Sequence, residues 1–357
     1  MTPLIVMNGL AQQAITVPFN SSAWNTENAE FMQTTFQGKK GILLNRGVLY
    51  LEEVEFLNGV IEVDINFSDR RNFPGVRFRM EDLQNFENFY IRPHQSGNPD
   101  ANQYNPVFNG TAGWQLYHGK NWSTPIAYTF GQWHHIKIVV SGNVADIYFD
   151  DMVKPLLSVD LLRDPASGSI GISTAIAPVF FANFKYTLDN GEISYDKHKS
   201  NISPSTITTW EVSQVLSDSS WLDQYTLNKN FKKSLNWQTH QSEFTGLINL
   251  ARYGKRSPGR NTIIAKLEID SRQQQLKKLD FGFSDRVRVY LNDQAIYEGE
   301  DRFRSRDYRF LGTMGFFDTL ILPLNKGKNE LLFVVTENFG GWAVQAKFDT
   351  MEDISLK

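Results

Sequence analysis

The chain has 357 residues, a formal net charge of −3 and a pI near 6.1. This length is enough for two domains that each bury a core. The small net charge gives no electrostatic reason to expect nucleic acid or an anionic membrane as a partner. Because the sequence contains no cysteine, disulfides, thiolate metal sites and a cysteine nucleophile are all excluded.

The N-terminus, MTPLIVMNGLAQQAITV, has an apolar run over residues 4–7 followed by small and polar residues. This is the pattern of the end of a secretory signal without its basic beginning, although a plain N-terminal strand fits the same residues. We therefore expect a secreted or periplasmic protein. No run of about 18 apolar residues occurs, so we predict no membrane span.

Alternation of apolar and polar residues with a period of two dominates the chain, and no long segment has helical periodicity. In GVIEVDINF, Ile61 and Val63 alternate with Glu62 and Asp64. The same pattern continues in GVRFRM, NFYIRP, WHHIKIVV and ADIYFDD, and GSIGIST and FFANFKY complete a first unit over residues 15–188.

Residues 189–209 are polar and rich in turn formers, which predicts an interdomain linker. A second unit over residues 210–357 contains NTIIAKLEID, TLILPLNKGKNELLFVV and GGWAVQAKF, with a hairpin signal at Asn292-Asp293. We therefore predict an all-β protein of two antiparallel β-sandwich (jelly-roll) domains joined by a polar linker.

The polar positions of the first unit are unusually rich in Arg and Tyr for a solvated sheet face. Guanidinium groups form planar bidentate hydrogen bonds and phenol rings stack, so this composition suits a polyhydroxylated ligand. A lattice of cross-strand salt bridges, with Glu62 and Asp64 against Arg77 and Arg79, would explain the same residues without a ligand. The residues expected on this face are Glu62, Asp64, Asn66, Arg77, Arg79, Tyr90, Arg92, Gln115, Tyr117, His135, Lys137, Asp146 and Tyr148.

The stretch NFYIRPHQSGNPDANQYNPVFNGTAGW leaves the strand that carries Tyr90 and Arg92 and returns at Trp114. We predict a loop over one edge of the polar face, since binding groups are often carried by loops on a rigid β-scaffold. Contact with solvent alone would also make such a loop polar. The side chains expected there are His94, Gln95, Asn98, Asp100, Asn102, Gln103, Tyr104 and Asn109.

The stretches FLNGVIEVDINF, FPGVRFRMEDLQNFENFYIRP and GQWHHIKIVVSGNVADIYFDD make the first unit resemble concanavalin A-like lectin/glucanase and laminin-G-like jelly rolls. The second unit, with DRVRVYLNDQAIYEG and LNKGKNELLFVVTENFGGWAVQAKF, resembles the galactose-binding-like jelly rolls found beside glycosidase catalytic domains. The resemblance implies a glycan or oligosaccharide as partner. It also implies that Trp342 is structural or lies at the rim of a ligand site, and we favour the structural role.

Family-sixteen glycoside hydrolases share the first fold and carry Glu-x-Asp-x-(x)-Glu on one strand. Glu62 and Asp64 match the first two positions, but Asn66 or Phe67 stands where the resemblance would require the acid/base. A glycosidase also needs one carboxyl with a raised pKa, which nearby arginines would lower. Glu62 and Asp64 are the only candidates for catalysis that this pattern offers. Because the acid/base residue is missing, we expect that they do not catalyse glycoside hydrolysis.

The segment GEDRFRSRDYRF places Arg302, Arg304 and Arg306 in one phase of a predicted strand. Such a stripe suits a carboxylated or sulfated sugar, or it protects a surface strand from edge pairing. Arg304, Arg306 and Trp342 are the ligand candidates of the second unit. We expect no cofactor apart from structural calcium, for which Asp and backbone oxygens in turns of either unit are suitable.

These observations predict a non-catalytic carbohydrate-binding protein that recognises a glycan on the polar face of the first sandwich. The first alternative is a glycan-processing enzyme, a hydrolase or a polysaccharide lyase, that uses the same face. A lyase would use Tyr or His as its base and Arg to neutralise a uronate. The second alternative is an adhesion scaffold that binds other proteins and no sugar.

Overall fold

The computed structural model describes residues 13–189, 202–217, 224–305, 307 and 309–357. The chain folds into two compact units. The second unit takes Leu83–Asn85 and Asn105–His118 in addition to the C-terminal part of the chain, and the first unit takes the rest. Most of the predicted linker and residues 1–12 of the predicted signal lie outside the described residues.

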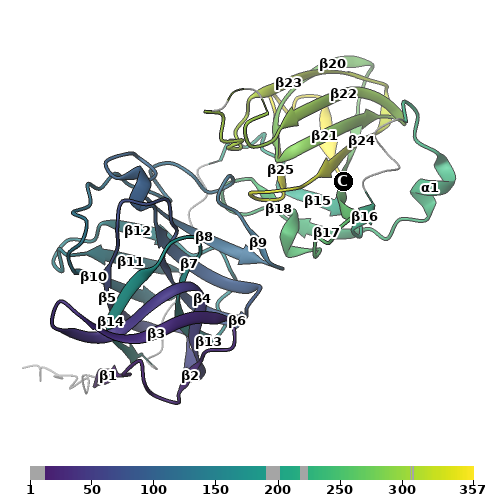
Figure 1. Ribbon diagram of the computed structural model, residues 1–357. Coiled ribbons are helices and arrows are strands. Elements are labelled where there is room, and N and C mark those ends of the chain that lie inside the picture. The colour runs from purple at the N-terminus through teal and green to yellow at the C-terminus, as the bar shows by residue number, and fades with distance from the viewer. Residues whose placement is uncertain (1–12, 190–201, 218–223, 306, 308) are drawn as a thin grey trace, which may run out of the picture. The chain divides into compact units, whose positions relative to one another are not determined.

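The regular elements in the N-terminal half of the chain are strands apart from one 3-10 turn. Every pairing of these strands is antiparallel, which confirms the all-β prediction (Figure 1). In chain order the elements are β1 (Ile15–Thr16), β2 (Trp24–Asn25), β3 (Ala29–Phe36), β4 (Lys39–Phe56), β5 (Gly59–Asn66), β6 (Gly75–Asp82), β7 (Asn85–Ile91), the 3-10 turn η1 (Pro93–Gln95), β8 (Asn102–Phe108), β9 (Thr111–Ala112), β10 (His134–Ser141), β11 (Val144–Phe149), β12 (Leu157–Asp160), β13 (Gly168–Thr174) and β14 (Val179–Leu188).

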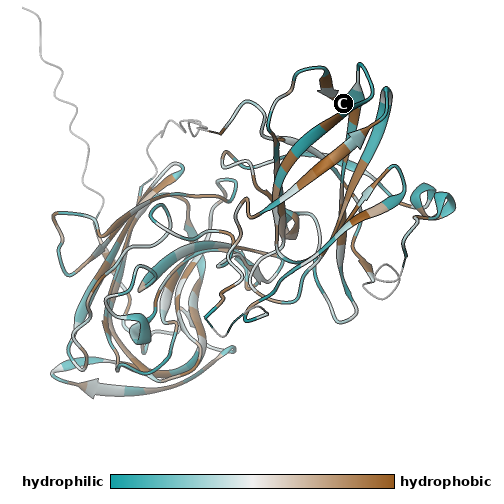
Figure 2. Ribbon diagram, turned by 90° about the horizontal axis from the view of Figure 1, so that it is seen from above, coloured by the Kyte–Doolittle hydropathy of each residue, from teal (hydrophilic) through white to brown (hydrophobic). Residues whose placement is uncertain are grey.

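The long strand β4 connects the two layers of this sandwich. Its residues 41–44 pair with β14, and its residues 47–56 pair with β13. One layer therefore has the order β12-β11-β10-β5-β14, and the other continues through β13-β6-β7-β8. Hydrophobic and hydrophilic residues alternate along these strands (Figure 2), and the apolar ones form the core between the layers. Core residues include Ile61, Val63, Ile65, Val76, Phe78, Phe89, Ile91, Ile136, Ile138, Ile170 and Ile172.

A β-bulge interrupts the alternation in β6. Ser169 of β13 pairs with Met80, but Gly171 pairs with Arg77, so β6 has one more residue than β13 between these pairs. Arg79 lies at this irregularity with a φ of +48°, and its side chain is buried. The bulge therefore turns Arg79 away from the face that alternation predicts for it.

The C-terminal half forms a second antiparallel sandwich. Its sheets have the orders β17-β15-β19-β24-β21-β22 and β18-β25-β20-β23, and β16 and β26 pair with β19. The elements are β15 (Thr209–Val212), β16 (Leu216–Ser217), α1 (Lys229–Lys233), β17 (Gln238–Gln241), β18 (Ile248–Asn249), the 3-10 turn η3 (Leu250–Arg252), β19 (Arg260–Ser271), β20 (Gln275–Phe283), β21 (Asp285–Leu291), β22 (Gln294–Asp301), β23 (Asp318–Leu324), β24 (Gly327–Thr336), β25 (Ala343–Phe348) and β26 (Ile354–Leu356).

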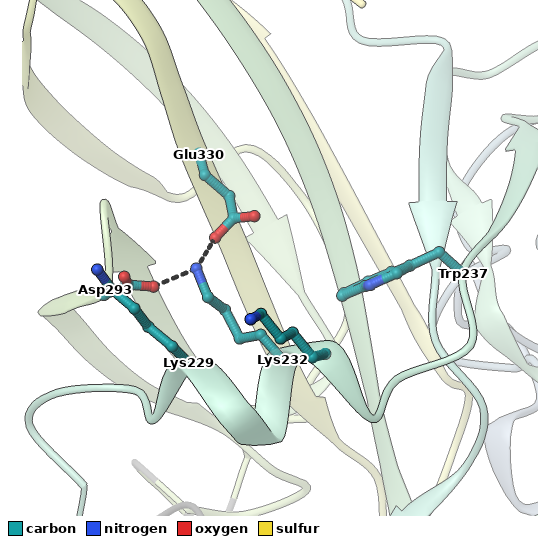
Figure 3. A pocket seen from close by; sticks show the side chains of 6 residues that line it. Lys229, Lys232, Trp237, Asp293 and Glu330 are labelled. Atoms are coloured by element: carbon teal, nitrogen blue, oxygen red, sulfur yellow. Dashed lines mark hydrogen bonds and ion pairs between the residues drawn. The ribbon is translucent and has the colours of Figure 1, made fainter.

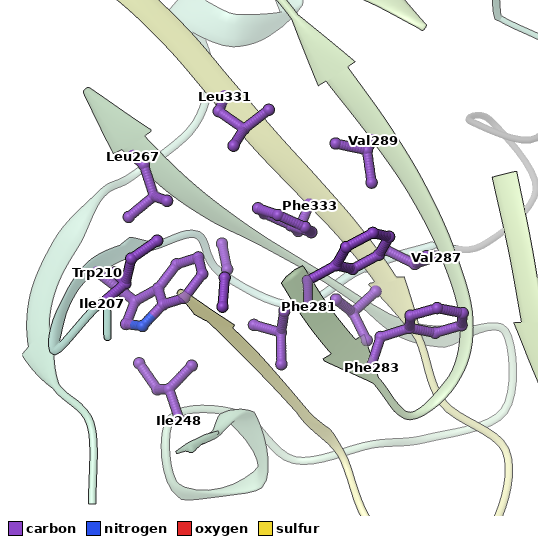
Figure 4. Close-up of a cluster of buried hydrophobic side chains, with 14 of the residues drawn as sticks. Ile207, Trp210, Ile248, Leu267, Phe281, Phe283, Val287, Val289, Leu331 and Phe333 are labelled. Carbon is purple, nitrogen blue, oxygen red and sulfur yellow. The ribbon is translucent and has the colours of Figure 1, made fainter. Parts of the chain in front are cut away.

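Aliphatic side chains and a cluster of aromatic rings form the core of this second unit (Figure 4). The rings of Trp210 and Phe333 have centroids 5.7 Å apart, and Phe281 lies 5.6 Å from Phe333. At the predicted hairpin, Asn292 and Asp293 have φ values of 51° and 72°. Positive φ at both positions is what a two-residue type I′ turn requires, and Asn and Asp tolerate it better than most residues.

Candidate functional site

The predicted polar face is divided between the two layers of the first sandwich. Glu62 and Asp64 alternate with core residues of β5, so they point outward from the layer that contains β5 and β10. Arg77 and Tyr90 alternate with core residues of β6 and β7 in the other layer. The two sets therefore lie on opposite outer faces, and the expected single band does not form. Period-two alternation cannot reveal this division, because it shows which side of a strand is polar but not which layer contains the strand.

On the β6 and β7 face, a glycine separates two large polar side chains. Tyr50 of β4 pairs with Gly171 of β13, and Gly171 pairs with Arg77 of β6. A Cβ at Gly171 would lie 2.3 Å from the backbone oxygen of Leu49 and 2.8 Å from the Cβ of Tyr50, so only glycine fits there. No side chain therefore rises from the sheet between Tyr50 and Arg77, whose strands lie about 10 Å apart.

A second row on the same face also contains a glycine. Ser173 of β13 pairs with Gly75 of β6. A Cβ at Gly75 would be 2.8 Å from the Cβ of Tyr90, which places Tyr90 beside it on β7. Asn88, two residues before Tyr90, points to the same side of β7. This face thus combines aromatic and hydrogen-bonding groups with two positions that lack a side chain.

Arg77 is the principal charged group of this face. Its guanidinium lies 4.3 Å from the ring centroid of Phe86, and its Nε donates to Ser173 Oγ at 3.3 Å. Burial lowers its pKa to about 10, which leaves it charged at neutral pH. No carboxylate in the described ranges pairs with it, and its two terminal nitrogens have no other partner there. Because Arg77 is only partly buried, these N–H groups can donate to a ligand.

Tyr90, Arg92 and Gln103 form a buried network beside Arg77. The Tyr90 hydroxyl donates to Gln103 Oε1 at 2.7 Å, and an Arg92 nitrogen donates to the Tyr90 oxygen at 2.6 Å and also to Gln103. Arg92 further donates to the backbone oxygen of Asp100 at 2.8 Å. Burial raises the pKa of Tyr90 to about 12. These polar atoms bond one another, so the network holds β7, β8 and the intervening loop in place.

His94 and its neighbours lie at the edge of this network. The ring of Phe73 meets both Tyr90, at 6.0 Å between centroids, and His94, at 5.4 Å. Burial and the nearby Arg71 lower the pKa of His94. Gln95 accepts a hydrogen bond from Asn98 at 2.6 Å. Part of the predicted loop is strand β8, whose residues are all buried. Its run of Asn, Gln and Tyr has the composition of a loop, but their side chains bond inside the sandwich.

Three further predicted ligand residues lie elsewhere. Tyr104 faces the core, where its hydroxyl donates to Glu87 at 2.6 Å. Tyr117 belongs to the second unit, donates to Glu243 at 2.8 Å and accepts from Asn249. Gln115 of the same unit is buried, with its backbone N–H bonded to the oxygen of Gly340 and its backbone oxygen accepting from Met314. None of these side chains is on the face that carries Arg77.

Arg79 is likewise absent from that face. Its Nε donates to the backbone oxygen of Leu57 at 2.7 Å, and another nitrogen donates to the oxygen of Gly142 at 2.7 Å and to Asn58 Oδ1 at 3.2 Å. The guanidinium therefore ties two distant turns together below the bulge. The predicted pairing of Arg77 and Arg79 with Glu62 and Asp64 is wrong because these groups belong to different layers.

The carboxylates of Glu62 and Asp64 have other partners. His135 donates to Asp64 at 2.6 Å and to Glu62 at 2.8 Å. Although burial opposes it, hydrogen bonds from His135, Lys39 and Asn183 lower the pKa of Asp64 to about 2. A general acid in glycoside hydrolysis needs the opposite shift. The cluster is a cross-strand ionic lattice, built with His and Lys in place of the expected arginines.

Arg302 and Arg304 of the predicted basic stripe do not lie in a strand. β22 ends at Asp301, and Phe303 and Arg304 form a turn. Arg302 pairs with Glu300, whereas Arg304 is exposed with its guanidinium 4.9 Å from the Phe303 ring. Arg306 lies outside the described residues. Trp342 is fully buried, and its indole N–H donates to the backbone oxygen of Val335 at 3.2 Å.

Sequence reasoning did not identify Tyr50, Phe86, Asn88 or Ser173 as members of this face. The only signal available was a glycine inside each of two predicted strands, which often marks close approach of another group. Among the described residues, no group of three or more His, Asp or Glu side chains is placed to hold a metal ion. In the same part of the chain, no helix is long and apolar enough to cross a membrane.

No protein-family model matches the chain, and none of the curated proteins matches it either. Among solved structures, carbohydrate binding module CBM66 from Bacillus subtilis matches with a TM-score of 0.38 and 18% identity, over 47% of this chain and 97% of that one. A β-glucanase from Bacillus licheniformis matches with a TM-score of 0.35 and 12% identity, over 50% and 100%. The Ca²⁺-bound exoplasmic/lumenal domain of VIP36 matches with a TM-score of 0.37 and 9% identity, over 52% and 97%.

Proposed function

We propose that this protein binds a glycan, without acting on it chemically, on the outward face of β6, β7 and β13. The observation that carries this proposal is the state of Arg77. A charged guanidinium packed on an aromatic ring, with no carboxylate partner in the described ranges, has donors left for an external acceptor. Because Arg77 is only partly buried, its terminal N–H groups face solvent, and a bound ligand can accept hydrogen bonds from them.

The neighbours of Arg77 support a sugar as the external acceptor. Tyr50 and Asn88 supply a ring and an amide on the same face, and Gly171 leaves space between Tyr50 and Arg77. Saccharides present ring hydroxyls to planar donors and an apolar ring face to aromatic side chains. The Tyr90 network next to this position is preformed, so a ligand would not have to order it. We also propose that the chain is exported, as its N-terminal residues led us to expect.

The enzymatic alternative has less support on this face, because Arg77 contacts Phe86 and Ser173 and pairs with no carboxylate in the described ranges. The nearby carboxylates of Glu27 and Glu52 lie beside Tyr50, and Glu52 accepts a hydrogen bond from Asn25. The carboxylates that the sequence suggested for catalysis lie on the opposite layer, and Asp64 is held ionised by its hydrogen bonds. We therefore propose binding rather than hydrolysis.

A glycan array of the full chain, followed by calorimetric titration of the strongest glycan, tests the proposal. Arg77→Met keeps the packing on Phe86 but removes the donors, and we expect it to weaken binding by tenfold or more, about 1.4 kcal/mol. The matched control is Arg46→Met, which removes an exposed arginine paired with Glu30. Equal affinities of Arg77→Met and the unmodified chain, or no bound glycan on the array, would overturn the proposal.

A further inference from the structure

The second unit has a pocket of about 280 Å³ on the outer side of its larger sheet (Figure 3). Its lining consists of Lys229, Lys232, Lys233, Trp237, Asp293 and Glu330. None of these residues belongs to the face that carries Arg77. The pocket lies between the segment that contains α1, the turn between β21 and β22 that carries Asp293, and the strand β24 that carries Glu330.

The segment that forms the pocket is anchored by apolar packing. Leu227 and Leu235, on either side of α1, are buried against Ile264, Leu332 and Val334 of the sheet. The backbone N–H of Leu227 also donates to the oxygen of Asp293 at 2.9 Å. Because both ends of α1 are held, its lysines have defined positions at the pocket.

Lys232 forms ion pairs within the protein. Its ammonium bonds the carboxylates of both Asp293 and Glu330, as the dashed lines in Figure 3 show. Burial opposes the charge of Lys232, but the two carboxylates raise its pKa above the ordinary value. The carboxylates are thereby oriented at one end of the pocket, and each oxygen has lone pairs that can accept from ligand hydroxyls.

Lys229 and Lys233 differ from Lys232 in having no acidic partner. Both are exposed at the pocket, and no ion pair involves either of them in the part of the chain that the structure describes. With three ammonium groups and two carboxylates, the lining is net positive. The two lysines can therefore pair with an anionic group on a ligand.

Trp237 closes the other end of the pocket, away from Asp293 in Figure 3. The ammonium of Lys266 lies 4.5 Å from the ring centroid and is itself held by Glu211 at 2.7 Å. The indole is partly exposed. An aromatic ring placed in this way offers a flat apolar surface of the kind on which sugar rings stack.

We propose that this pocket binds an anionic saccharide residue. Its carboxylate or sulfate lies at Lys229 and Lys233, its hydroxyls donate to Asp293 and Glu330, and its apolar ring face packs on Trp237. The volume of about 280 Å³ is slightly below the usual range for small-molecule sites, which begins at about 300 Å³, and it suits one sugar ring. A plain anion would leave Trp237 and the two carboxylate acceptors without a partner, and a neutral sugar would leave both lysines unused. This site is independent of the one proposed on the first unit.

Calorimetric titration of the full chain tests this assignment with four probes: tetragalacturonate, a chondroitin sulfate tetrasaccharide, cellotetraose and sodium sulfate. We expect binding of at least one of the first two, and none of the neutral or inorganic probes. Binding of tetragalacturonate would show that a carboxylate is sufficient. Binding of the chondroitin sulfate tetrasaccharide alone, which carries both carboxylates and sulfates, would show that sulfate is required. Affinity should fall as salt is added, because ion pairs at Lys229 and Lys233 are screened.

The variant Lys229→Gln with Lys233→Gln should lose about tenfold in affinity, since two exposed ionic contacts disappear. Lys255→Gln with Lys326→Gln is the matched control, because it removes the same charge from two exposed positions of the same unit that do not line the pocket. Trp237→Phe should weaken binding of the oligosaccharide, and Arg77→Met should leave it unchanged. The assignment would be overturned by equal losses in the two double variants, by sodium sulfate binding as tightly as the oligosaccharides, or by no binding of either anionic probe.

Discussion

The imidazole of His135 on β10 donates a hydrogen bond of 2.6 Å to the carboxylate of Asp64 on the paired strand β5. Its other ring nitrogen lies 2.8 Å from Glu62. Both nitrogens thus face carboxylates, and only the doubly protonated imidazolium can donate to both. The outer face of this layer is therefore held by an ionic cluster whose strength depends on pH.

The first prediction concerns the alkaline side of this dependence. The hydrogen bond to Asp64 raises the pKa of His135. A raised histidine pKa contributes stability below the unfolded value of 6.5, and this contribution is lost as pH rises through the folded pKa. Between pH 6 and pH 9, the unmodified chain should lose about 1 kcal/mol more of its unfolding free energy than His135→Gln, measured by urea denaturation. His118→Gln is the control, since its ring bonds a backbone oxygen. Parallel pH profiles for His135→Gln and the unmodified chain would contradict the prediction.

The second prediction separates two arginines that stand two positions apart. Arg79→Met removes the donors to the backbone oxygens of Leu57 and Gly142 and leaves buried acceptors unsatisfied. We expect it to lower the unfolding free energy by about 3 kcal/mol. Arg77→Met should lower it by less than about 1 kcal/mol, because Arg77 has one long hydrogen bond. Chemical denaturation of both variants checks this, and similar losses would show that the bulge does not direct Arg79 to a structural role.

The third prediction concerns a buried acidic pair in the second unit. Burial raises the pKa of Glu337 well above its ordinary value of 4.5, and the nearby Asp285 adds to this. The folded state then holds a proton that the unfolded state releases, so stability is present at low pH and falls as pH rises above about 4.5. Glu337→Gln should remove part of this fall, about 1.4 kcal/mol for each unit by which the pKa is raised.

Denaturation curves at pH 5, 7 and 9 measure this difference. Glu352→Gln, at an exposed position, is the matched control and should keep the profile of the unmodified chain. If Glu337→Gln is less stable than the unmodified chain by the same amount at every pH, the Glu337 carboxyl is not protonated in the folded state and the prediction is wrong.

The fourth prediction concerns Trp342, which the sequence left between a structural and a ligand-binding role. Its side chain is fully buried in the core of the second unit. Trp342→Ala should therefore lower the unfolding free energy by about 3–5 kcal/mol. Trp237→Ala, at a partly exposed ring, should lower it by clearly less. Comparable thermal stabilities of Trp342→Ala and the unmodified chain would exclude the structural role.

The local pattern of the sequence was sufficient for the class of fold. Alternation in GVIEVDINF predicts a strand because side chains of a β-strand point to opposite sides in turn. Asn292-Asp293 predicts a hairpin because both residues tolerate positive φ. These signals depend only on neighbouring residues, so they can be read without knowing the partner strands.

The composition of the candidate site required the tertiary structure. Alternation placed Arg79 beside Arg77, but a bulge in β6, stabilised by bonds to Leu57 and Gly142, turns it inward. Tyr117 was expected on the polar face, yet its hydroxyl bonds Glu243, which is 126 residues away in the chain. Which layer a strand joins, and which distant group satisfies a buried polar atom, are decided by contacts between remote segments. A period of two carries no information about them.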